Sequence, residues 1–265
     1  MAFSVPYSGR IAAILLAAGA IVLGAMTAAS AASPEQALVS VALPHVASIL
    51  AQGAPLRIVA FGSSSTEGAG ASSPAATYPA RLQAELRAVL PGSSVTVINR
   101  GVGGEEADDM MRRLPKIIAE HPNLVIWQTG SNDPLKGLPL ERFIGETRRG
   151  IDAMRAAAID VMLMTPQDCP VLQAVPGSVR YRDALRTLGA ELGVPVIRRF
   201  DLMREWLAVG KLTRAQLMSR DELHMTDGGY ALLARAVSDQ ILAAGGHSAP
   251  APTALVAAKS TARTF

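Results

Sequence analysis

The sequence predicts an α/β protein: a three-layer α/β/α sandwich built on a doubly wound, five-stranded parallel sheet. From about residue 56 onward, short apolar runs alternate with amphipathic stretches, which is the pattern of a parallel sheet covered by helices on both faces. The chain has 265 residues, of which 49% are hydrophobic, so it can bury the core of one medium domain. Right-handed crossovers between the strands then distribute the helices over the two faces.

Five short apolar runs are the predicted strands. Each run ends in residues that favour loops, such as Gly, Asn, Thr or Pro. The predicted strands are Leu56–Phe61, Val95–Asn99, Leu124–Gln128, Val161–Thr165 and Val194–Arg198.

Five amphipathic stretches are the predicted helices, because their apolar residues recur at helical spacing. They run from Tyr78 to Leu90, from Met110 to Ile118, from Phe143 to Met154, from Tyr181 to Leu192 and from Tyr230 to Ile241. We expect Pro115 to bend the second of them, because proline lacks the backbone N–H and its ring crowds the preceding turn.

The first 32 residues form a separate unit. Arg10 and the amino terminus give a weak positive charge, and no charged residue interrupts the stretch from Ile11 to Met26. Ala29-Ser30-Ala31 supplies the small residues that a signal peptidase requires, so we expect an export signal that is cleaved before Ala32. The alternative is an uncleaved membrane anchor, because the apolar run 11–29 approaches the ~20 residues that span a bilayer. Both interpretations place the rest of the chain outside the cytoplasm: in the periplasm, secreted, or anchored to the outer face of the inner membrane.

Three further segments follow. We expect residues 33–55 to be a helical lead-in, in which an amphipathic helix from Pro34 to Gln52 is interrupted at Pro44. Residues 56–245 form the main domain. Residues 246–265 are dominated by small and polar residue types, a composition typical of a disordered tail.

Charge and composition exclude several classes of function. The basic residues behind the net charge of +3 alternate with acids, and only 4% of residues are aromatic, so no basic stripe with interleaved aromatics is present to bind nucleic acid. Cys169 is the only cysteine, which rules out an internal disulfide. The four histidines lack metal-ligand spacing; they are His45, His121, His224 and His247. We therefore expect no metal site and a small, aliphatic binding surface.

Four polar segments stand where a parallel sheet places its ligand, just after a strand or just before the last helix. They are Gly62–Gly68, Asn99–Gly104, Gly130–Asp133 and Asp221–His224. A serine attacks a carbonyl only when a neutral imidazole lies within hydrogen-bond reach and a carboxylate orients that imidazole. The serines of the first segment and the Asp221–His224 pair supply these groups. Singly the same residues are common in turns and helix caps, so it is their combination that predicts a serine hydrolase.

In these four segments the sequence resembles the SGNH hydrolases, also called GDSL esterases and lipases, whose four blocks contribute Ser, Gly, Asn and His in this order. The resemblance covers roughly residues 56 to 244. It implies a flavodoxin-like sheet and hydrolysis of esters or thioesters without a metal or organic cofactor. By position, it implies Ser64 as the nucleophile, His224 as the base and Asp221 as the orienter. It also implies an oxyanion hole made of the backbone N–H groups of Ser64 and Gly104 and the side-chain amide of Asn132.

The first block departs from the family at one position, because Ser63 stands where the family usually has Asp. Ser63 and Ser65 are therefore alternative nucleophiles. Neighbouring residues at the end of an extended strand point to opposite faces, so we expect only one of the three serines to suit catalysis, and the position within the block favours Ser64.

The expected function is that of an exported serine esterase acting on carboxylic esters, with short acyl or acetyl groups on carbohydrates or small alcohols favoured over other substrates. Lipid-directed hydrolysis, as by a lysophospholipase or thioesterase, is the main alternative, because of the apolar segment near the amino terminus. Two further alternatives are an acyltransferase and a non-catalytic envelope protein that binds acylated glycans. All four blocks are intact, which favours catalysis.

Overall fold

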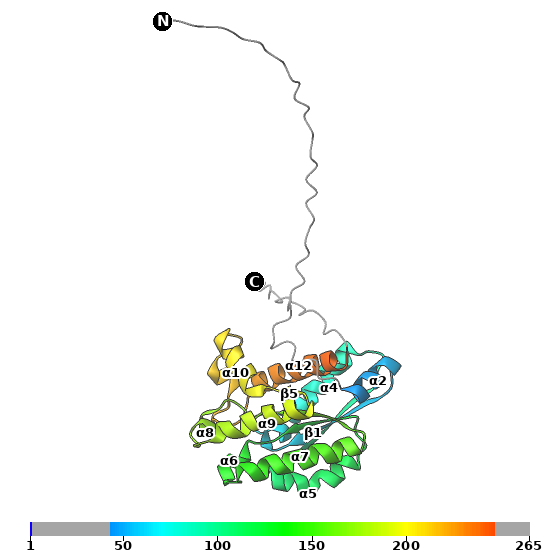
Figure 1. The fold of residues 1–265 in the computed structure, drawn as a ribbon, viewed down its shortest axis with the longest axis horizontal. Helices are drawn as coiled ribbons and strands as arrows, with labels where there is room; N and C mark the ends of the chain where they lie inside the picture. Colours follow the sequence, from blue (N-terminus) through cyan, green and yellow to red (C-terminus); the bar gives the residue numbers. More distant parts are fainter. Residues whose placement is uncertain (2–42, 247–265) are drawn as a thin grey trace, which may run out of the picture.

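The computed structural model describes residues 43–246 and Met1 (Figure 1). The predicted export signal or anchor, the first part of the lead-in and nearly all of the predicted tail lie outside these residues. Within residues 43–246, none of the helices combines the length and the apolar character needed to cross a membrane.

Five parallel strands form one sheet in the order β2-β1-β3-β4-β5. The strands are β1 (Leu56–Gly62), β2 (Val95–Gly101), β3 (Leu124–Gln128), β4 (Asp160–Met164) and β5 (Val196–Ile197). The predicted fold class is confirmed. The chain moves outward to β2 on one side of β1 and to β3, β4 and β5 on the other, so the direction of winding changes between β1 and β3. A ligand site is expected at the carboxyl ends of these two strands.

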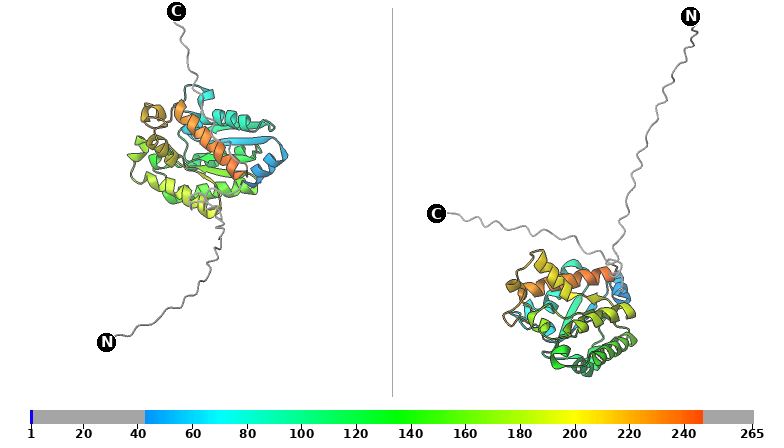
Figure 2. Two further views of the ribbon diagram at one scale, coloured as in Figure 1. Left: turned by 90° about the horizontal axis from the view of Figure 1, so that it is seen from above. Right: turned by 60° about the vertical axis from the view of Figure 1, so that its left-hand side comes forward.

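Two layers of helices enclose the sheet (Figures 1 and 2). One layer contains α2 (Pro44–Gln52), α4 (Tyr78–Val89), α10 (Arg199–Ala208) and α12 (Asp227–Ala244). The other contains α5 (Ala107–Ile118), α7 (Leu140–Ala156) and α9 (Ser178–Leu192). All five predicted helices are present among them. Helix α5 continues through Pro115.

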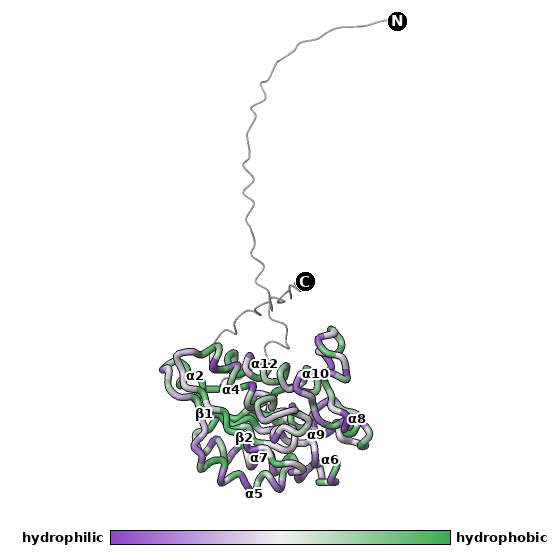
Figure 3. The backbone as a smooth tube through the Cα atoms, turned by 180° about the vertical axis from the view of Figure 1, so that it is seen from behind, coloured by the Kyte–Doolittle hydropathy of each residue, from purple (hydrophilic) through white to green (hydrophobic). Residues whose placement is uncertain are grey.

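The hydrophobic core consists of two clusters, one on each face of the sheet. In β1, Ile58 and Ala60 belong to the cluster under α4 and α12, whereas Val59 and Phe61 belong to the cluster over α5 and α7. Both faces of β1 and β3 are buried, which explains why these strands read as continuous apolar runs. Figure 3 shows the hydrophobic segments gathered in the sheet, with hydrophilic turns on the outer sides of α5 and α7.

Helix α2, at the start of residues 43–246, belongs to this core. It begins at Pro44, where the sequence predicted an interruption, and its side chains Val46 and Leu50 are buried in the same cluster as the residues of α12. The N–H of Leu43 donates to the carbonyl of Ala244 at 3.1 Å. Helix α2 is therefore packed against the end of α12 and does not stand apart from the domain.

The structure differs from the sequence-based expectation at its edge strand. Strand β5 covers only Val196–Ile197 instead of residues 194–198, because Pro195 has no N–H to donate and Arg198 already leads into α10. Helix α10 was not predicted. Five short helical turns were also not predicted: α3 (Ser64–Glu67), η1 (Pro74–Ala76), α6 (Asn132–Lys136), α8 (Pro170–Gln173) and α11 (Arg214–Leu217).

Candidate active site

Ser64 lies at a tight strand-to-helix turn at the carboxyl end of β1. The strand ends at Gly62, Ser63 is extended, and Ser64 is the first residue of α3. A Cβ atom on Gly62 would lie 2.8 Å from Gln128 Oε1, and one on Gly101 would lie 2.0 Å from the backbone nitrogen of Glu67. Only glycine fits these close approaches. The serines therefore do not continue an extended strand, and the turn itself separates their side chains: Ser63 and Ser65 are buried, whereas Ser64 is half-buried.

Ser64, His224 and Asp221 form a hydrogen-bonded series. The distance from Ser64 Oγ to His224 Nε2 is 2.8 Å, and the distance from His224 Nδ1 to Asp221 Oδ2 is 2.5 Å. Asp221 and His224 meet because their segment turns back on itself, with Glu222 in the left-handed region at a φ of 55°. The three residues expected to carry the chemistry are thus adjacent in space, in the sequence serine, imidazole, carboxylate.

The Asp221 carboxylate is held in its ionised form. Burial on its own raises the pKa of Asp221, but the hydrogen bonds from His224, Ser219 and Leu223 outweigh burial and lower the pKa overall. The donors are the backbone N–H groups of Leu223 and His224 at 3.0 and 2.9 Å and the Ser219 hydroxyl at 2.5 Å. A fixed negative charge at Nδ1 favours the tautomer in which Nε2 accepts a proton from Ser64.

The segment that contains Gly103 and Gly104 lies beside Ser64. A Cβ on Gly103 would lie 3.9 Å from Ser64 Cβ, and Gly104 is exposed with nothing within 4 Å of an added Cβ. Asn132, the first residue of α6, donates from Nδ2 to the carbonyl of Glu105 at 2.7 Å. An amide carries two N–H bonds, so this contact leaves one for another acceptor. The structure thus joins the Asn132 side chain to the segment of Gly104, next to Ser64.

Asp133 is a buried carboxylate whose role the sequence analysis missed. Its two oxygens accept the N–H groups of Ala107 at 2.8 Å and Gly130 at 3.0 Å. Burial raises the pKa of Asp133 to about 6, although these hydrogen bonds oppose the increase. Asp133 therefore ties the segment after β2 to the segment after β3. Its position directly after Asn132 was the only signal in the sequence.

Three further buried polar side chains beneath the site also escaped the sequence analysis: Gln128, Gln167 and Arg199. Gln128 ends β3, Gln167 follows β4, and Arg199 begins α10. Arg199 is fully buried, although it is one of the basic residues that the sequence analysis described only as alternating with acids. A polar residue at the end of an otherwise apolar strand was a signal for Gln128. Neither of the other two had one.

The remaining histidine and cysteine candidates lie elsewhere. His45 Nδ1 lies 2.8 Å from Asp160 Oδ1 at the amino-terminal edge of the sheet, away from the strand ends that carry Ser64. Cys169 is buried, and burial raises the pKa of its thiol. In the part of the chain that the structure describes, no group of three or more His, Cys, Asp or Glu side chains could hold a metal ion.

A cavity of about 340 Å³ lies beside the segments that follow β3 and β4; Ser64, Asp221 and His224 are not among its walls. It shares Gly130 and Gln167 with the segments described above, and most of its other walls are apolar. The apolar residues include Pro166, Leu172, Val175, Val179 and Phe200. Arg182 and Gln173 are polar exceptions in its wall. The apolar part of such a space suits a small apolar group.

Comparison with known proteins agrees with this architecture. The family model described as the non-GDSL lipase-like family matches residues 29–246. An arylesterase of Vibrio mimicus is 31% identical over 74 residues, which are 28% of this chain and 37% of the arylesterase. The chain therefore matches little more than a third of that relative's length.

Solved structures share the fold at low identity. A G-D-S-L family lipolytic protein from Desulfitobacterium hafniense DCB-2 superposes with a TM-score of 0.59 at 22% identity, over 69% of this chain and 98% of that one. A two-domain esterase active on acetylated mannans has a TM-score of 0.64 at 18% identity, over 80% of this chain and 55% of that one. The acetylxylan esterase Axe2 of Geobacillus stearothermophilus has a TM-score of 0.59 at 20% identity, over 71% of this chain and 95% of that one.

The family match covers most of the chain, including all four polar segments, and confirms the resemblance predicted from them. The chain belongs to the non-GDSL lipase-like family and, with it, to the SGNH hydrolase superfamily of enzymes.

Proposed function

We propose that the protein is a serine esterase that hydrolyses carboxylic esters through an acyl-enzyme on Ser64. The observation that carries this proposal is the unbroken series from Ser64 Oγ to His224 Nε2 at 2.8 Å and from His224 Nδ1 to Asp221 at 2.5 Å. These distances lie within the range in which a base can take the proton of a nucleophile.

The reaction begins when Ser64 Oγ attacks the ester carbonyl carbon and His224 Nε2 accepts the hydroxyl proton. The tetrahedral intermediate collapses as the bond to the alcohol breaks, and His224 returns the proton to the leaving alcohol. A water molecule then attacks the acyl-enzyme. His224 takes its proton, the acid is released, and Ser64 is restored. Asp221 stays ionised throughout and stabilises the transient imidazolium.

Gly104, Asn132 and the backbone of Ser64 are the proposed donors to the negative oxygen of the intermediate. Two of these segments are joined by the Asn132–Glu105 hydrogen bond, and Asp133 ties their ends together. Donors fixed in advance stabilise the transition state because they do not have to reorganise when charge develops. The loss of one such donor typically costs about 3 kcal/mol of transition-state stabilisation.

Short acyl groups on carbohydrates or small alcohols are the proposed substrates. The cavity of about 340 Å³ beside Gly130 and Gln167 is mostly apolar, which fits a short acyl or other small apolar group. Two structurally similar proteins act on acetylated mannans and acetylated xylan, and the Vibrio relative is an arylesterase. We also propose that residues 1–32 direct export, either as a cleaved signal or as an anchor.

The test is hydrolysis of p-nitrophenyl acetate, butyrate and octanoate by the full chain. We expect the activity to fall with increasing acyl length. We also expect Ser64→Ala and His224→Ala each to abolish it. The buried serines supply controls, because Ser63→Ala and Ser65→Ala leave the hydroxyl of Ser64 in place. Both should keep most of the activity, with a small loss in Ser63→Ala because it removes the hydrogen bond to Gln128. Highest activity on octanoate would favour a lipid-directed esterase. Equal background rates in all variants would contradict the proposal and favour a binding protein.

A further inference from the structure

A series of buried hydrogen bonds joins the segment that carries Ser64 to the segment that carries His224. Gln128 Oε1 accepts from the backbone N–H of Ser63 at 3.0 Å and from its hydroxyl at 3.1 Å. Gln128 Nε2 donates to Ser131 Oγ at 3.3 Å, and Ser131 donates to Gln167 Oε1 at 3.1 Å. Gln167 Nε2 then donates to the carbonyl of Leu223 at 3.0 Å. Leu223 directly precedes His224.

The direction of this series is fixed at both ends. A backbone N–H can only donate, so the Ser63 N–H requires the oxygen of the Gln128 amide to face it. The guanidinium of Arg199, which donates to Gln167 Oε1 at 2.6 Å, imposes the same orientation on Gln167. The Gln167 amide nitrogen must therefore face Leu223. Each side chain thus has one arrangement that satisfies its neighbours.

The sheet order explains how these residues meet. Ser63 follows β1, Gln128 ends β3 and Gln167 follows β4, and these three strands are neighbours. The series therefore crosses the carboxyl edge of the sheet from strand to strand. It reaches the segment of His224, which arrives from the distant end of the chain.

Arg199 occupies a position that stability alone does not favour. It is fully buried at the first residue of α10, where the helix dipole is unfavourable for a cation. Its hydrogen-bond acceptors, the Thr165 carbonyl at 3.0 Å and Gln167 Oε1, are uncharged. Its Nη1 is buried without a hydrogen-bond partner in the described part of the chain. Burial of a guanidinium is costly without a compensating charge, and it lowers the pKa of Arg199 to about 10.

We propose that Gln167, oriented by Arg199, is a positioning residue that holds the Leu223 carbonyl and thereby sets the imidazole of His224 at bonding distance from Ser64. This inference rests on the proposed esterase function. Gln167 is not a catalytic residue, because it acts through the backbone of Leu223, the residue that precedes His224. Its effect should appear mainly in kcat, since a displaced base slows proton transfer. Gln167 also forms part of the wall of the cavity of about 340 Å³, so a smaller change in KM is expected as well.

The decisive variant is Gln167→Glu in the full chain. A carboxylate retains an oxygen for Arg199 and Ser131 and adds an ion pair, so the protein should remain folded. The same change sets a second oxygen against the Leu223 carbonyl in place of a donor. We expect kcat for p-nitrophenyl acetate to fall at least about 10-fold and up to the ~100-fold associated with a misplacement of about 1 Å, while KM changes by a smaller factor.

The matched control is Gln83→Glu. Gln83 lies on α4 and uses only its oxygen, which accepts the N–H of Val97 at 2.9 Å, so the same substitution there should leave kcat unchanged. If Gln167→Glu does not fold, Ser131→Ala decides, since it removes two hydrogen bonds of the series, those to Gln128 and Gln167, without adding charge. A loss in kcat of threefold or more, roughly 0.6 kcal/mol, supports the inference. A wild-type kcat in either folded variant overturns it.

A second readout separates this inference from the proposed function. The ring N–H signals of His224, assigned by comparison with His224→Ala, report its environment by NMR without any turnover. If the wild-type protein is inactive but the His224 signals shift in Gln167→Glu and not in Gln83→Glu, the esterase proposal fails and the positioning role stands. If the wild-type protein is active and neither kcat nor the His224 signals change in Gln167→Glu, the positioning role fails and the esterase proposal stands.

Discussion

The hydroxyl oxygen of Ser64 lies 2.8 Å from Nε2 of His224, although 160 positions separate the two residues in the chain. Ser64 follows the central strand β1, whereas His224 precedes α12, the last helix. Their contact depends on two independent supports. One is the tight turn after Gly62, and the other is the set of hydrogen bonds that Asp221 accepts from the segment of His224.

Asp221→Asn should lower kcat strongly while the protein stays folded. An amide in place of the carboxylate can present its NH₂ group to His224 Nδ1, which favours the tautomer with a proton on Nε2 and so prevents that atom from accepting the Ser64 proton. A decrease of about 10⁴-fold is the scale for this change in serine proteases. Steady-state kinetics with p-nitrophenyl acetate measure it. Asp227→Asn is the matched control, because Asp227 binds Ser72 in an exposed region, and it should retain wild-type kcat.

The contribution of Asp133 to the free energy of unfolding should decrease as the pH rises from about 4 to about 6. Its pKa is about 6 in the folded state and about 3.9 when unfolded, so the folded state binds more protons in this interval. The free energy of unfolding therefore falls with increasing pH. Urea unfolding of wild-type protein and Asp133→Asn across this range should show that the slope is smaller in the variant. Identical slopes would contradict the prediction.

Asp221 has the opposite dependence and a different pH window. Its pKa is lowered in the folded state, so its contribution is fully present above the unfolded value of about 3.9 and is lost as the pH falls below it. Unfolding measured below pH 4 should therefore show a steeper loss of stability in the wild-type protein than in Asp221→Asn.

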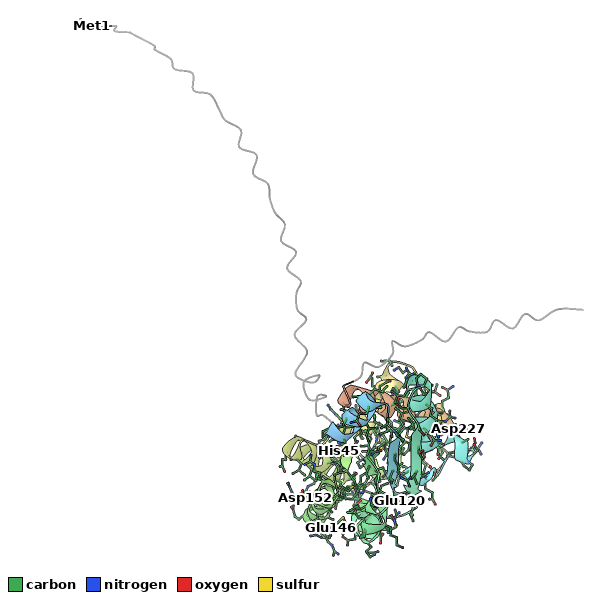
Figure 4. All side chains as sticks on the ribbon, turned by 90° about the vertical axis from the view of Figure 1, so that its right-hand side faces the viewer. Met1, His45, Glu120, Glu146, Asp152 and Asp227 are labelled. Carbon is green, nitrogen blue, oxygen red and sulfur yellow. The ribbon has the colours of Figure 1, made fainter. Side chains whose placement is uncertain are left out.

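Asp160→Ala should destabilise the fold without changing kcat. The buried Asp160 carboxylate accepts the Val46 N–H at 2.9 Å and contacts the His45 ring at 2.8 Å, so it anchors α2 to β4. Figure 4 shows His45 and Asp227, the first residue of α12, at widely separated places on the molecule. Loss of the acceptor leaves a buried N–H unsatisfied, which costs about 1–3 kcal/mol in the free energy of unfolding.

His45→Ala supplies the comparison for that prediction. The His45 side chain is 47% exposed, so its loss removes one partly solvated hydrogen bond, which contributes about 0.5–1.5 kcal/mol. Denaturant unfolding should therefore rank Asp160→Ala below His45→Ala in stability. A larger effect of His45→Ala would mean that the ring, rather than the backbone N–H of Val46, holds α2 in place.

The sequence predicted correctly those strands and helices that depend on local patterns of apolar residues. The central strands were recognisable because burial on both faces requires a continuous apolar run, as in Leu124–Gln128. Strand β5 and helix α10 were harder, because Arg198 and Arg199 interrupt the apolar pattern, and nothing in a sequence distinguishes a buried arginine from an exposed one. Gln167 lies 56 positions from its partner Leu223. Only the order of the strands brings them together.

Ser63→Asp, which introduces the residue usual in GDSL esterases, should weaken this protein. The buried Ser63 hydroxyl and the Thr66 hydroxyl both donate to Gln128 Oε1 at 3.1 Å, and a carboxylate at position 63 would face that oxygen without a proton to donate. Rotation of the Gln128 amide would relieve the repulsion, but the Ser63 N–H and the Thr66 hydroxyl would lose their acceptor. We expect a loss of about 1–3 kcal/mol in the free energy of unfolding, together with a lower kcat.

Ser63→Ala removes one hydrogen bond without adding charge and should be milder in both measurements. If Ser63→Asp instead equals wild type in stability and kcat, the Gln128 hydrogen bonds do not determine which residue this position accepts.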